Sequence, residues 1–137
     1  MTVVADTGAL YALVDASDAW HARVVRWWEL NREPILAPVS VLPEVTHLLQ
    51  SRIGAVAELE FVRSVAEGEL QTESLEPADF DRAVAVMERY ADLPLGFVDA
   101  SVVAVAERVD ARDILTTDRR HFSVVRPRHT RGFRLVP

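Results

Sequence analysis

The chain has 137 residues, half of them hydrophobic, and it contains no cysteine. This length suits one domain with its own core, the hydrophobic content argues against disorder, and the absence of cysteine excludes disulfides and cysteine-ligated zinc. No apolar run approaches the roughly 18 residues of a membrane span, and the start lacks a secretory pattern, so we expect a soluble, cytoplasmic protein.

Charge is unevenly distributed along the chain, whose formal net charge is −6. Residues 119–137 hold six arginines and no acid, whereas residues 1–118 hold nine arginines and all 21 acids. This division suits a body that binds cations and a basic end that contacts phosphates. A solvated basic end without any ligand would have the same composition.

The spacing of apolar residues predicts alternating strands and helices. In chain order we expect a strand at 3–5, helices at 9–14 and 18–30, a strand at 35–37, helices at 40–49 and 55–66, a strand at 70–75, helices at 77–90 and 98–109, and strands at 114–117 and 133–136. Asp18 and Ser40 are the expected N-caps of the second and third helices. The alternation predicts one three-layer α/β/α domain over residues 1–137, with four or five short, mainly parallel strands.

Four acids differ from the others in where they stand. Asp6 and Asp118 each follow a predicted strand, and parallel sheets bind ligands beyond the carboxyl ends of their strands. Asp99 is the only charged residue between Pro94 and Ala106, and an unpaired carboxylate is costly to bury there. Glu44 is also flanked by apolar residues, near a predicted helix start.

Each acid also has an ordinary structural interpretation. Asp6 and Asp118 could be N-caps, Asp99 could be stabilised by the first turn of its helix, and Glu44 could pair with an arginine. If the four instead converge, a shared cation is the usual way to keep them ionised. An all-oxygen ligand set favours Mg²⁺ or Mn²⁺ over zinc. Such ions activate water and bind phosphate oxygens, which indicates phosphoryl chemistry.

The chain resembles the PIN-domain ribonucleases, and in particular the VapC-type toxins of toxin–antitoxin pairs. Four motifs, in the family's order, carry the resemblance, which covers essentially the whole length. They are the segments Val4–Thr7, Ser40–Val45, Leu95–Ser101 and Ile114–Phe122.

The resemblance implies a divalent-metal endoribonuclease that cuts structured RNA, often tRNA or rRNA. Metal-activated water would cleave the phosphodiester and leave a 5′ phosphate and a 3′ hydroxyl. A homodimer and a small antitoxin partner are also implied. The residues that match family positions are Asp6 and Asp99 as the central metal ligands, Glu44 and Asp118 as the other two acids, and Thr116 as a supporting hydroxyl. Thr7 is expected to help support the site. Arg119 and Arg120 directly follow Asp118 in the sequence, and we expect them to contact RNA phosphates.

Two other functions are alternatives. Phosphatases of the haloacid-dehalogenase type also begin with an aspartate after the first strand, but they need a second one two residues later, where this chain has Gly8. A non-catalytic RNA- or protein-binding module is the other alternative.

For one histidine and the three tryptophans, the sequence indicates a location but no specific role. His121 is expected in a turn near the surface. The three tryptophans, Trp20, Trp27 and Trp28, could stack on RNA bases, but they are expected in the core or at a protein interface. The helices around 19–32 and 55–66 are expected to form a groove for an antitoxin helix.

Overall fold

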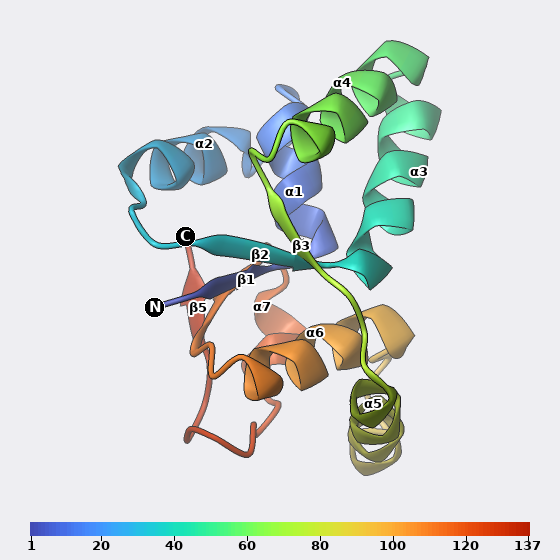
Figure 1. Ribbon diagram of the computed structural model, residues 1–137, viewed down its shortest axis with the longest axis vertical. Coiled ribbons are helices and arrows are strands. Elements are labelled where there is room, and N and C mark those ends of the chain that lie inside the picture. Colours follow the sequence, from blue (N-terminus) through green and yellow to red (C-terminus); the bar gives the residue numbers. More distant parts are fainter.

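The computed structural model describes residues 1–137 and has a five-stranded sheet between helices (Figure 1). The elements are β1 (Val3–Ala5), α1 (Thr7–Val14), α2 (His21–Leu30), β2 (Ile35–Pro38), the 3-10 helix η1 (Val39–Val41), α3 (Leu42–Arg52), α4 (Ala55–Ala66), β3 (Gln71–Glu73), α5 (Pro77–Arg89), α6 (Phe97–Arg108), β4 (Asp113–Leu115), α7 (Arg119–Phe122) and β5 (Arg134–Val136). The strand order is β3-β2-β1-β4-β5, and every neighbouring pair is parallel. The predicted α/β architecture is therefore confirmed.

The sheet is covered on both faces. Helices α1 to α4 lie on one side, and α5 and α6 lie on the other (Figure 1). Every residue of β1 and β4 is buried, as expected for short parallel strands without an exposed face. One apolar core joins Val4 and Ile114 of the strands to Leu10 of α1 and Val103 of α6.

The order in which successive strands are added to the sheet reverses at β1. It runs outward from β1 through β2 to β3, and then returns through α5 and α6 to place β4 on the other side of β1. The ends of β1 and β4 therefore flank a topological switch point, where parallel sheets leave a crevice for ligands. The register sets Ala5 opposite Leu115, so Asp6 and Thr116 leave the sheet side by side.

Both predicted helix caps are wrong. Helix α2 begins at His21, and the Asp18 carboxylate instead accepts a hydrogen bond from the backbone N of Trp20 at 2.8 Å, in the turn before the helix. Helix α3 begins at Leu42, while Ser40 lies in η1 and its hydroxyl bonds to the hydroxyl of Ser101 at 2.6 Å. A turn precedes α2 and the 3-10 helix η1 precedes α3, so both helices start later than predicted.

The short helix α7 was not expected, since four residues are too few to show a helical period. None of the helices combines the length and hydropathy that a membrane span requires.

Candidate metal centre

Thr116 links the two acids that follow the central strands. Its hydroxyl donates to Oδ2 of Asp6 at 3.0 Å and accepts from the backbone N of Asp118 at 2.9 Å. The backbone N of Asp6 donates to the carbonyl of Leu115 at 2.9 Å, which extends the pairing of β1 and β4 by one residue. The sheet therefore holds Asp6 and Asp118 at one edge, as their positions after strands predicted.

Asp118 uses its two carboxylate oxygens differently. Oδ1 accepts hydrogen bonds from the backbone N of Arg120 and of His121, each at 3.0 Å, and so caps α7. Oδ2 lies 2.8 Å from Nδ1 of His121. The interpretation of Asp118 as a cap is thus correct for one oxygen, while the other oxygen faces the remaining site residues.

Asp99 approaches from the other face of the sheet, on the first turn of α6. Its Oδ2 lies 3.4 Å from Nδ1 of His121, and atoms of Asp99, Asp118 and His121 all lie within 4.8 Å of one another. Burial raises the pKa of Asp99, and the negative charges of Asp118 and Glu44 raise it further. Two elements that are distant in the sequence, α6 and the start of α7, therefore bring the carboxylates of Asp99 and Asp118 close together.

Asp6 is the most deeply buried of these acids, with 5% of its surface exposed. Burial first, and the charge of Asp99 second, raise the pKa of Asp6 to about 7. It stands at the N-cap position of α1 but makes no capping hydrogen bond with its side chain. The hydroxyl of Thr7, next in the chain, is buried without a hydrogen-bond partner.

Glu44 lies at the rim of the cluster. It occupies the first turn of α3 and is exposed, and its charge acts on Asp99. No arginine or lysine forms an ion pair with Asp6, Glu44, Asp99 or Asp118. Carboxylates gathered without a cationic partner other than histidine form a donor set that fits a divalent ion.

His121 was expected in a turn near the surface, but it lies in helix α7 and is half-buried. Its side chain is 14% exposed and lies among the acids. The signal that could have placed it is the spacing of three residues from Asp118, which matters only if a helical turn forms there.

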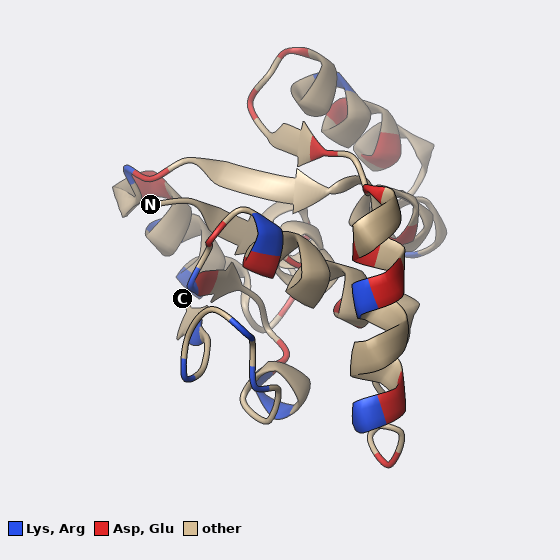
Figure 2. Cartoon of the chain, turned by 60° about the horizontal axis from the view of Figure 1, so that its bottom comes forward, with Lys and Arg blue, Asp and Glu red and all other residues tan.

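The two arginines after Asp118 differ in their surroundings. The Arg119 guanidinium donates to the carbonyls of Leu135, at 3.0 Å, and Pro137, and it lies 5.5 Å from the Trp20 ring centroid. The Arg120 side chain is exposed and makes no hydrogen bond or ion pair. Figure 2 shows the arginines of the C-terminal segment gathered on one part of the molecule.

Gly8 explains why α1 can pack closely against the segment after β4. A Cβ built on Gly8 would lie 2.4 Å from Oγ1 of Thr117, the residue between Thr116 and Asp118. A side chain at position 8 would therefore force the Thr117 side chain, next to Asp118, to move.

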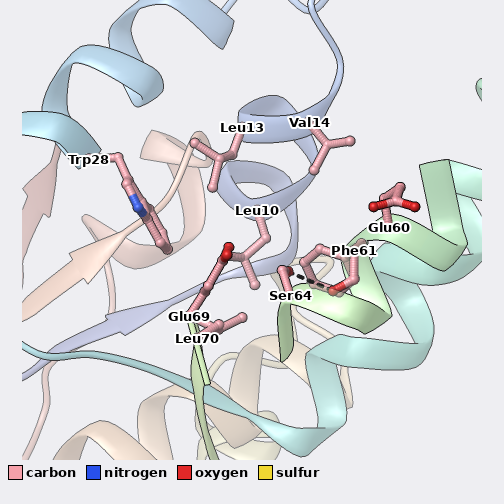
Figure 3. Close-up of a pocket in the computed structure, with 9 residues that line it drawn as sticks. All are labelled: Leu10, Leu13, Val14, Trp28, Glu60, Phe61, Ser64, Glu69 and Leu70. Carbon is pink, nitrogen blue, oxygen red and sulfur yellow. Dashed lines mark hydrogen bonds between the residues drawn. The ribbon is translucent and has the colours of Figure 1, made fainter. Parts of the chain in front are cut away.

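An apolar pocket of about 250 Å³ lies between α1, α2 and α4 (Figure 3). Its apolar lining includes Leu10, Trp28 and Phe61, and its polar residues include Glu60 and Glu69. This is the place where a groove between the two helical segments was predicted. Trp27 and Trp28 also pack against the core, in agreement with one of the two expectations for the tryptophans.

Comparison with known proteins adds a family match. The pattern of the PIN domain matches residues 3–126. "Ribonuclease VapC26" of Mycobacterium tuberculosis is 33% identical over 135 residues, which are 98% of this chain and 100% of that protein.

Two solved structures share the fold. The crystal structure of Mycobacterium tuberculosis VapC20, described as a sarcin-ricin loop cleaving toxin, superposes with a TM-score of 0.84 at 24% identity, over 95% of this chain and 99% of that chain. FitAcB from Neisseria gonorrhoeae superposes with a TM-score of 0.60 at 13% identity, over 85% of this chain and 87% of that chain.

Proposed function

The chain belongs to the PIN-domain family, and from this premise we propose that it is a VapC-type toxin that cleaves RNA as a metal-dependent endoribonuclease. The observation that carries the proposal is the convergence of Asp6, Asp99 and Asp118 beyond the ends of β1 and β4, without an arginine to neutralise them. The ribonuclease relative that spans nearly the whole chain supports the same activity.

The proposed cofactor is Mg²⁺, with Mn²⁺ as a substitute. Asp6, Asp99 and Asp118 would hold the ion, and Glu44 would complete the site from its rim. When bound, such an ion lowers the pKa of water and stabilises the charge that develops on a phosphodiester. A cation also explains how Asp6 can be ionised at neutral pH despite its burial, because an opposite charge lowers the pKa of a carboxyl group.

The surrounding residues position these acids. Thr116 fixes one oxygen of Asp6 and the backbone of Asp118, so both carboxylates keep their orientation before substrate arrives. The Thr7 hydroxyl, which has no partner, is proposed to bond to a ligand of the loaded site.

RNA is proposed to approach over the basic segment that follows the site. Arg120 is the stronger candidate for a phosphate contact because its guanidinium is free, whereas Arg119 already donates to two backbone carbonyls. Structured RNA such as tRNA or rRNA is the proposed substrate class.

A small antitoxin is the proposed protein partner, with the pocket of Figure 3 as its docking place. An amphipathic helix could bury an apolar side chain between α2 and α4 and set a basic residue against Glu60 or Glu69. A homodimer is proposed as well. The exposed apolar side chains that could support it are Phe80, Val84, Met87 and Phe97 on α5 and α6.

The phosphatase alternative is disfavoured by Gly8. A second aspartate at that position would need room where a Cβ alone would already lie 2.4 Å from Thr117 Oγ1.

The proposal is tested by mapping RNA ends after induction of the toxin, and by cleavage of the mapped RNA in vitro. We expect cleavage that EDTA abolishes and Mg²⁺ restores, with 5′ phosphate ends. Specific RNA binding without any cleavage would instead support the non-catalytic module.

A further inference from the structure

His121 differs from the other histidines in what its ring faces. His21 and His129 each bond to a backbone carbonyl, of Ala12 at 2.7 Å and of Ala111 at 2.6 Å. His47 is exposed on α3. The His121 ring is directed at carboxylates, and neither of its buried nitrogens makes a hydrogen bond of acceptable geometry.

The distances around His121 fit shared coordination of an ion. Two ligand atoms at right angles, each about 2.1 Å from one ion, lie about 3.0 Å apart. Nδ1 of His121 lies 2.8 Å from Oδ2 of Asp118 and 3.4 Å from Oδ2 of Asp99, on either side of that value. A short distance without hydrogen-bond geometry is what ligand atoms of one ion would show.

The fold itself brings the ring to this position. Asp118 caps α7 through Oδ1, and this cap forms the turn that carries His121 three residues along. The same residue thus offers Oδ2 to the site and directs the nitrogen donor toward it.

We propose that Nδ1 of His121 is a ligand of the divalent ion held by Asp99 and Asp118, and that it strengthens the binding of a transition-metal ion such as Mn²⁺ more than the binding of Mg²⁺. The inference rests on the proposed function in that this cluster must bind the ion. Mg²⁺ takes oxygen ligands almost exclusively, whereas imidazole is a ligand for transition-metal ions. The ligand set is then mixed, and not the all-oxygen set that the four acids alone predict.

The test uses the full chain with ¹⁵N-labelled histidine, loaded with Mn²⁺ alone and measured by pulsed EPR. We expect ¹⁵N coupling to the Mn²⁺ electron spin in the wild type and none in His121→Gln. By calorimetry, His121→Gln should bind Mn²⁺ about 10-fold or more weakly, while its Mg²⁺ affinity changes much less. His47→Gln is the matched control, because His47 lies three residues from Glu44 and could be the only other nearby source of the coupling.

The outcomes separate the two proposals. Mn²⁺ binding by the wild type without ¹⁵N coupling overturns the role of His121 and leaves the nuclease proposal standing. Coupling that survives in His121→Gln, or that disappears in His47→Gln, would also overturn the role of His121 and leave the nuclease proposal standing. A wild type that binds neither Mn²⁺ nor Mg²⁺ contradicts the proposed function itself. The wild-type spectrum decides the matter even if the His121 variant does not fold, which circular dichroism would show.

Discussion

The protein has two clusters of acids, and they differ in what neutralises them. On the α5–α6 side, Arg108 forms ion pairs with Glu73, Glu76 and Asp79, and Arg82 pairs with Glu107. At the carboxyl ends of β1 and β4, Asp6, Asp99 and Asp118 meet without any arginine.

Two carboxylates that are buried to the same extent can differ in whether a charged partner neutralises them. Asp79 is 3% exposed and Asp6 is 5% exposed, so both carboxylates are equally removed from water. The guanidinium of Arg108 bonds to Asp79 at 3.1 Å, and this carboxylate in turn raises the pKa of Arg108. Asp6 has no cationic partner, and burial together with the charge of Asp99 raises its pKa to about 7 although the Thr116 hydroxyl donates to it. The first cluster is neutralised by arginines of the same chain, whereas the second has no arginine partner and its donor set could hold a metal ion.

The largest expected effect is on activity. Asp99→Asn should lower RNA cleavage at least about 1,000-fold, because it removes one carboxylate that would hold the ion. Its ion-free stability should not fall, since a repulsive charge is also removed. Single-turnover cleavage and urea unfolding measure the two quantities. Asp92→Asn, at an exposed turn residue, is the control; full cleavage by Asp99→Asn would remove this residue from the centre.

The next largest effect is a pH dependence of the stability of the ion-free protein. Folded Asp6 keeps its proton up to about pH 7, whereas an unfolded aspartate loses it near pH 4, so the folded state binds more protons between these values. The free energy of unfolding should therefore fall as pH rises through this window, by an amount of order 4 kcal/mol. Added Mg²⁺ should reverse the loss above pH 7.

Urea unfolding with EDTA at pH 5 and pH 8 measures this dependence. Asp6→Asn should have a flatter profile than the wild type, because the substituted side chain does not titrate. Identical profiles for the two proteins would show that Asp6 does not titrate as described.

In the arginine-paired cluster, loss of a carboxylate should lower stability and leave ion binding unchanged, which is the reverse of the result expected for Asp99→Asn. Asp79→Asn should cost about 2 kcal/mol of stability, because it leaves Arg108 without its most buried partner and weakens the bond from the backbone N of Glu76. Mg²⁺ affinity, measured by calorimetry, should stay unchanged. A loss of Mg²⁺ binding in this variant would erase the distinction between the two clusters.

The smallest expected effect concerns RNA. Arg120→Gln should weaken RNA binding a few-fold and reduce the slope of log affinity against log salt by about 0.7 to 0.9. Filter binding at several salt concentrations measures this slope, with Arg26→Gln on α2 as the control. An unaltered slope in Arg120→Gln would show that this side chain does not contact phosphate.

The sequence contained enough to predict the acid cluster. Asp6 and Asp118 follow strands, and parallel strands end at one edge, so their convergence follows from topology. Asp99 stood out because no other charge occurs in its apolar segment.

The side-chain positions that could not be predicted depend on contacts between residues that are distant in the sequence. Ser40 bonds to a residue 61 positions away, and Arg119 bonds to the end of the chain. His121 lies on a helix too short to show a period, and its ring direction depends on the cap that Asp118 provides. Each of these side chains takes its position from tertiary contacts, which outweigh the local preferences read from sequence.

The most direct test of a shared cation is a crystal of the full chain soaked in Mn²⁺ and measured for anomalous scattering. We expect one or two peaks bounded by Asp6, Asp99 and Asp118, and none beside the acids that surround Arg108. An ion found only at that second cluster, or no ion at the first under saturating Mn²⁺, would contradict the metal centre.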